Sequence, residues 1–161
     1  MIKIELGVSG WLAHIATMPS QAALLLVTIL PATAAGAVFE YFLGHRHDYT
    51  GHFLAGYGGT LGAMMVWLRT VPERRYAVLS TWGIVPMCVV CILLGAIFEA
   101  TIFRLAKFDE VDFCNQSLGA VFAAAAALVL VHDPKPQVQL MDFGLIVGIV
   151  FLGAGGIYAV A

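Results

Sequence analysis

The chain has 161 residues, of which 61% are hydrophobic and only 11% are charged, and its mean hydropathy is +0.92. Since a soluble domain carries about 25% charged residues, this composition excludes an ordinary soluble domain. The formal net charge is −2, and the basic residues are spread over loops and tails rather than gathered into a patch, which argues against nucleic-acid binding. The sequence therefore predicts an integral membrane protein.

Five apolar stretches alternate with short polar segments, and a helix needs about 20 apolar residues to cross a bilayer. We expect an all-α integral membrane bundle of five transmembrane helices that forms one domain over residues 1–161. Residues 1–19 mix aromatic, polar and apolar side chains at helical spacing, which favours a short N-terminal interfacial helix. The predicted spans are 21–43, 51–68, 76–105, 112–131 and 143–160.

The distribution of lysine and arginine predicts the orientation, because these residues are enriched in cytoplasmic loops. Three basic residues share a face with the loop at residues 44–50, and five lie at the opposite face. This bias predicts a cytoplasmic N-terminus, with the loop at the outer face. The five residues are Lys3, Arg69, Arg74, Arg75 and Lys135.

Polar side chains gather at the predicted outer face, because the first and third spans end there and the second and fourth begin there. Ionisable side chains inside spans are costly and usually face the bundle interior or a wet cavity, which makes Glu40 and Glu99 candidate functional residues. The full set at this face is Glu40, His45, His47, Asp48, His52, Glu99, Asp109, Glu110, Asp112, Asn115 and Gln116.

Asp48 and His52 are four residues apart, so a helix that begins by residue 48 places them on one face. A carboxylate beside a histidine orients the ring and raises its basicity, which makes the pair an acid/base unit near neutral pH. Asp48 is equally suited to capping the helix N-terminus. Asp112 begins the fourth span in the same way, with Gln116 one turn above it.

Besides an acid/base site, two other classes of function remain open. His45, His47 and His52 with nearby carboxylates are typical ligands of zinc or iron, which would make the chain a metal-dependent membrane enzyme with a divalent metal cofactor. Alternatively, a non-catalytic subunit of a membrane complex or homo-oligomer would pack through small residues. Those residues are Gly56, Gly58, Gly59 and Gly62, and the segment from Gly153 to Gly156.

Three motifs resemble those of a known family. They are Asp48-(x)3-His52-Phe53 at the start of one span, Glu99 at the end of the next, and Asp112-Phe113-Cys114-Asn115-Gln116-Ser117-Leu118-Gly119 at the start of the one after. In this order they resemble the small VanZ-like membrane proteins, named for a teicoplanin-resistance protein. The resemblance covers about residues 45–125. Two positions depart from the pattern: Gln116 stands where the family has Asn, and Ile102 where Gln often follows the Glu.

The resemblance implies a cell-envelope location and a link to glycopeptide antibiotic resistance or envelope lipids, without a reaction that can be carried over. It matches best at Asp48, His52, Glu99 and Asp112, which we therefore expect to be the catalytic residues. We expect the protein to bind or modify the head group of an envelope lipid or lipid-linked precursor at the outer face of a bacterial inner membrane. Glu99 and Asp112 would then hold a cation, sugar or amine, and arginines would meet phosphate. The expected ligand-binding residues are Glu40, Arg46, Arg104, Asn115 and Gln116.

Overall fold

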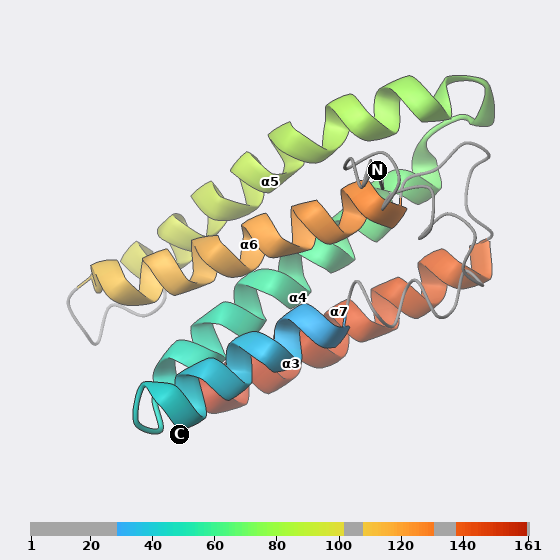
Figure 1. The fold of residues 1–161 in the computed structure, drawn as a ribbon. Coiled ribbons are helices and arrows are strands. Elements are labelled where there is room, and N and C mark those ends of the chain that lie inside the picture. The colour runs from blue at the N-terminus through green and yellow to red at the C-terminus, as the bar shows by residue number, and fades with distance from the viewer. Residues whose placement is uncertain (1–28, 102–107, 131–137, 161) are drawn as a thin grey trace, which may run out of the picture.

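The computed structural model describes residues 29–101, 108–130 and 138–160. All regular elements in these ranges are helical, which confirms the expected all-α bundle (Figure 1). The expected N-terminal interfacial helix and Arg104 lie outside the described residues. The α-helices are α3 (Leu30–Ala37), α4 (His47–Thr70), α5 (Tyr76–Thr101), α6 (Glu110–Leu130) and α7 (Val138–Val160); a π-helix (Val38–Phe42) continues α3, and a short 3-10 helix (Glu73–Arg75) precedes α5.

Three of the helices contain segments long and apolar enough to cross a membrane, as an integral membrane protein requires. These segments are Val78–Thr101, Glu110–Leu130 and Met141–Ala159. Of the other two expected spans, 21–43 lies partly outside the described residues, and 51–68 falls within α4. Helix α4 has 24 residues, or about 36 Å of helix, but its glycines, threonines and two histidines make it less apolar than the other three helices.

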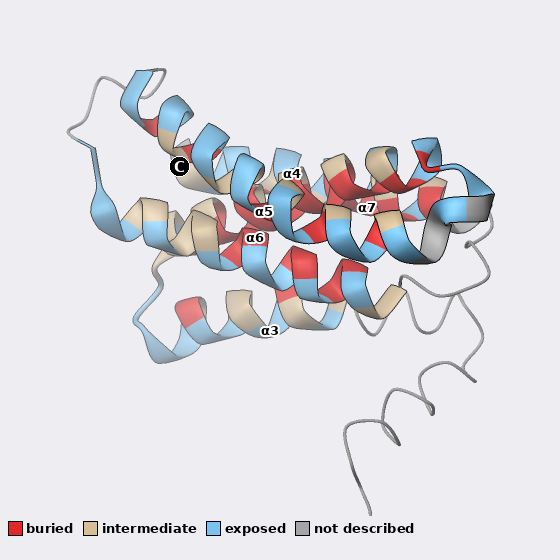
Figure 2. Ribbon diagram, turned by 90° about the horizontal axis from the view of Figure 1, so that it is seen from above, coloured by how far each residue is buried: buried red, intermediate tan, exposed pale blue. Residues whose placement is uncertain are grey.

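Helix α4 is the centre of the bundle, and its burial explains why it does not need a strongly apolar surface. Tyr57, Phe53, Leu61 and Met64 on α4 are fully buried. Figure 2 shows buried residues on the faces that the helices turn toward one another, whereas the outer face of α5 is exposed. Because α4 is covered by its neighbours, only the surrounding helices need apolar side chains toward lipid.

Glycines bring the helix backbones together along α4. A Cβ atom at Gly58 would collide with the backbone of α7, and a Cβ atom at Gly56 would collide with the backbone of Gln116 on α6. Small residues at helix interfaces in membranes allow this close approach. The glycine face that was expected to receive another helix is therefore occupied by α6 and α7 of the same chain.

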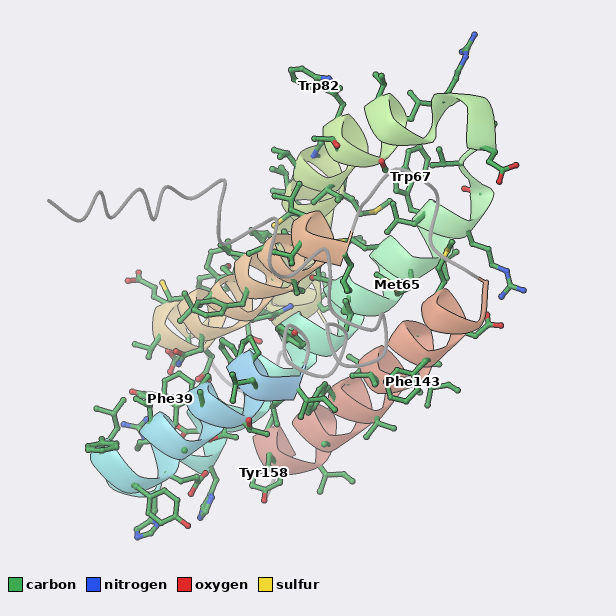
Figure 3. The ribbon with its side chains drawn as sticks, turned by 45° about the vertical axis from the view of Figure 1, so that its right-hand side comes forward. Phe39, Met65, Trp67, Trp82, Phe143 and Tyr158 are labelled. Atoms are coloured by element: carbon green, nitrogen blue, oxygen red, sulfur yellow. The ribbon has the colours of Figure 1, made fainter. Side chains whose placement is uncertain are left out.

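The contacts also define the directions of the helices. Gly56 packs on Gln116, and Tyr57, further along α4, packs on Gly119, further along α6. Gly95 on α5 packs on the side chain of Gln116. Together with the short connections, these contacts give an up-and-down bundle in which α4 and α6 run one way and α3, α5 and α7 run the other. As Figure 3 shows, Trp82 on α5 points away from the bundle, as a lipid-facing side chain would.

Candidate functional site

The ends of α3, α5 and α7 and the starts of α4 and α6 meet at one end of the bundle, where the sequence predicts a gathering of polar side chains (Figure 1). The chain turns there at Gly44 and His45, which both adopt positive φ angles, 81° and 60°. Such a backbone is uncommon for a residue other than glycine. The backbone N–H of His45 donates to the carbonyl oxygen of Glu40 at 2.9 Å. This turn places Glu40 beside the first turn of α4.

Glu40 is the acceptor around which this turn is organised. Its Oε1 lies 2.9 Å from Nδ1 of His47 and accepts a hydrogen bond from the Thr50 hydroxyl at 3.0 Å. Its Oε2 lies 3.8 Å from Nδ1 of His45, which is longer than a hydrogen bond. The Glu40 side chain is 20% exposed. The contacts with His47 and Thr50 therefore fix Oε1 of Glu40, whereas Oε2 can still accept hydrogen bonds.

Asp48 pairs with Arg46. Nε and Nη2 of Arg46 donate to the two carboxylate oxygens of Asp48 at 3.1 and 2.7 Å, and the guanidinium lies 3.6 Å above the Tyr49 ring. The hydrogen bonds from Arg46 hold the pKa of Asp48 below its usual range. The expected pairing of Asp48 with His52 is not formed, because a bidentate guanidinium is a stronger partner for a carboxylate than a ring four residues away. Arg46 was expected to bind phosphate, but its guanidinium is already paired with Asp48.

His52 pairs instead with Asp112, across the interface of α4 and α6. Nε2 of His52 lies 3.4 Å from Oδ2 of Asp112, and the two side chains are only 15% and 19% exposed. One turn further along both helices, Gly56 lets the α6 backbone approach closely at Gln116. Both members of this pair were expected to be catalytic, but their direct contact was not predicted.

Further polar side chains line the interface of α5 with α6. Glu99 is buried, with 7% of its surface exposed. The Gln116 side chain packs over Gly95, one turn before Glu99, and since α5 and α6 are antiparallel, Glu99 is level with Asp112. On α6, Nδ2 of Asn115 is buried and has no hydrogen-bond partner among the described residues. Side chains near the His52–Asp112 pair thus retain hydrogen-bonding capacity.

On the other side of α4, a groove of about 450 Å³ lies between α3, α4 and α7. Its wall is mainly apolar, and its polar residues Glu40, His45, Thr50 and Tyr158 stand at the same end of the bundle as the turn. Sequence reasoning missed Thr50 and Tyr158 as site residues, although an aromatic residue in the last turn of a span is typical of a membrane interface. The lining residues are Ala32, Thr33, Gly36, Ala37, Glu40, Tyr41, His45, Thr50, Leu54, Phe151 and Tyr158.

The three histidines proposed as metal ligands are divided between two places. His45 and His47 lie beside Glu40, whereas His52 lies beside Asp112. Within residues 29–101, 108–130 and 138–160, no group of three or more histidine, cysteine, aspartate or glutamate side chains is arranged to hold a metal ion. The predicted three-histidine site is therefore not assembled in this part of the chain.

Comparison with known proteins provides no further assignment. No protein-family model, curated protein or solved structure matches this chain. The resemblance to VanZ-like proteins stays a prediction that rests on the motifs around Asp48, His52, Glu99 and Asp112.

Proposed function

We propose that this protein binds the head group of an envelope lipid or lipid-linked precursor at the outer face of a bacterial inner membrane, and that His52 acts on it. The observation that carries the proposal is the His52–Asp112 contact of 3.4 Å between two largely buried side chains. An ion pair at a water-exposed surface would contribute little. A largely buried pair at the end of a membrane bundle is typical of a functional site.

The pair has the chemistry to exchange a proton with a ligand. The Asp112 carboxylate orients the His52 ring, so that the ring can donate to, or accept from, a hydroxyl, amine or phosphate group. Asp112 takes the orienting role that was expected of Asp48. Its position as the third residue of α6 is close to a membrane boundary, where lipid head groups lie.

Side chains near the pair supply groups that could orient a head group. Glu99 is a buried carboxylate level with Asp112, and Asn115 offers a buried amide nitrogen that has no hydrogen-bond partner within the described ranges. Carboxylates and amides accept and donate hydrogen bonds to hydroxyl and amine groups. A sugar or amine part of the head group fits this set better than a bare phosphate does. The link to glycopeptide resistance belongs to the same proposal, and it rests on the VanZ-like motifs.

The test compares the lipids that co-purify with the protein in mild detergent. We expect His52→Ala and Asp112→Asn to lose the same lipid class by about tenfold, because each removes one half of a buried charged hydrogen bond. Glu110→Gln is the matched control, because Glu110 is an exposed acidic residue on the first turn of α6. Variants that remain folded and retain the parent's full lipid content would contradict the proposal.

A further inference from the structure

The groove between α3, α4 and α7 has the dimensions of a binding site. Its volume of about 450 Å³ lies within the roughly 300–1,000 Å³ that is usual for small-molecule sites. Small or apolar residues form most of its wall, including Ala32, Gly36, Leu54 and Phe151. Such a wall offers no partners to a polar ligand along most of its length, but it suits a hydrocarbon chain.

The surroundings of the groove indicate what fills it. Apolar side chains beside it are exposed on the outside of the bundle, among them Leu30, Val38 and Ile157. Helix α7, which forms one wall, contains one of the candidate membrane spans. A groove that opens between such surfaces faces lipid, so an acyl chain is the hydrocarbon available to occupy it.

The polar end of the groove selects for a positive charge. Oε1 of Glu40 contacts His47 and Thr50, whereas the contact of Oε2 within the described part of the chain is with the ring of His45, at 3.8 Å. A carboxylate offers about four acceptor positions, so Oε2 can accept from a group with several N–H donors. Among the described residues, the lining contains no lysine or arginine, so the Glu40 carboxylate would repel a head group with only negative charge.

We propose that this groove is a second lipid site, which holds one acyl chain of a membrane lipid while the primary ammonium of its head group donates to Oε2 of Glu40. The site is separate from the His52–Asp112 pair. Thr50 and Leu54 line the groove, and residues two positions apart in a helix point in directions about 200° apart. His52 therefore lies on the opposite side of α4 and would not contact a lipid in the groove.

The head-group part of this proposal is tested by native mass spectrometry of delipidated protein titrated with two lipids of identical chains, phosphatidylethanolamine and phosphatidylglycerol. We expect the parent to bind phosphatidylethanolamine about tenfold more tightly, and Glu40→Gln to lose this preference. Glu110→Gln is the matched control, because it removes an exposed acid at the same end but outside the groove. Equal binding of the two lipids by the parent would overturn the proposal.

The acyl-chain part is tested by filling the groove. A Cβ at Gly36 would lie 3.8 Å from the Thr50 methyl group, so Gly36→Phe fits the backbone while its ring occupies the groove. Ala34→Phe places the same ring on the exposed face of α3. We expect Gly36→Phe to weaken binding of both lipids by about tenfold and Ala34→Phe to leave it unchanged.

His52→Ala separates this proposal from the proposed function. We expect it to leave phosphatidylethanolamine binding unchanged even while it removes the lipid class bound at the His52–Asp112 pair. Folding of every variant is checked by its thermal unfolding in detergent. A folded Gly36→Phe variant that binds like the parent would overturn the groove site, as would a loss of phosphatidylethanolamine binding in His52→Ala equal to that in Glu40→Gln.

Discussion

The two sides of helix α4 differ in how closely the neighbouring helix approaches. On the α6 side, a Cβ atom at Gly56 would collide with the backbone of Gln116, whereas on the α3 side a Cβ atom at Gly36 would meet nothing closer than 3.8 Å. The first side buries the His52–Asp112 pair, and the second leaves a groove that ends at Glu40. One end of the bundle thus combines a buried polar pair on the α6 side with an open groove on the α3 side. The backbone contact at Gly56 and the space beside Gly36 distinguish the two sides.

A side chain added at Gly56, where α4 and α6 are in close contact, should produce the largest loss of stability. We expect Gly56→Ala to destabilise the bundle by about 1–3 kcal/mol, as overpacking does, because the added methyl group must displace the α6 backbone. The matched change on the open side, Gly36→Ala, should stabilise the protein slightly, by up to about 1 kcal/mol, because alanine is the better helix former. Unfolding in a denaturing detergent titration measures both free energies. Equal losses from the two changes would contradict the difference between the two sides.

Breaking the buried pair should produce an intermediate effect. We expect Asp112→Asn to lower the free energy of unfolding by about 1–2 kcal/mol, and His52→Ala to cost a similar amount. Because each variant removes the same contact, the double variant should cost clearly less than the sum of the two single variants. A double-mutant cycle in detergent measures this coupling. Strict additivity would mean that the 3.4 Å contact contributes nothing.

The exposed pair at Asp48 should produce the smallest effect, and it should depend on pH and salt. Arg46 lowers the pKa of Asp48 in the folded state, so the pair stabilises the protein above the unfolded pKa of about 3.9 and is lost as the pH falls through the folded value. The small difference in stability between Asp48→Asn and the parent should therefore be constant from pH 7 to pH 5 and vanish in strong acid. This difference in stability should also shrink at high salt, because nearly half of the Asp48 side chain is exposed and salt screens the attraction between exposed charges. A difference that grows on acidification would contradict this assignment.

Local sequence patterns predicted the helices well, because apolar runs of about 20 residues and short polar connections leave few alternatives. Helix α4 begins at His47 and contains the expected span 51–68, whereas α5 is described to Thr101 and the last residues of the expected span 76–105 lie outside the described residues. The glycines of α4 allow the close approach of α6 and α7, since a bare surface on a helix in a membrane bundle is typical of such contacts.

Local sequence patterns could not predict which polar residues contact one another. The spacing of Asp48 and His52 favoured a contact along one helix, but Arg46 lies even closer in sequence and holds Asp48 with two hydrogen bonds. The actual partner of His52 is 60 positions away, and the contact depends on the parallel packing of α4 and α6. The groove was missed for the same reason, because three separate helices form it. Such contacts come from tertiary packing, which no periodicity encodes.

The most direct test of the central claim is to measure, for one preparation each of the parent, His52→Ala and Asp112→Asn, the amount of every lipid class that co-purifies with the folded protein. The account predicts that both variants lose the same lipid class by about tenfold, while the phosphatidylethanolamine bound through Glu40 is retained. Lipid content that is unchanged in both folded variants would contradict a head-group site at the His52–Asp112 pair.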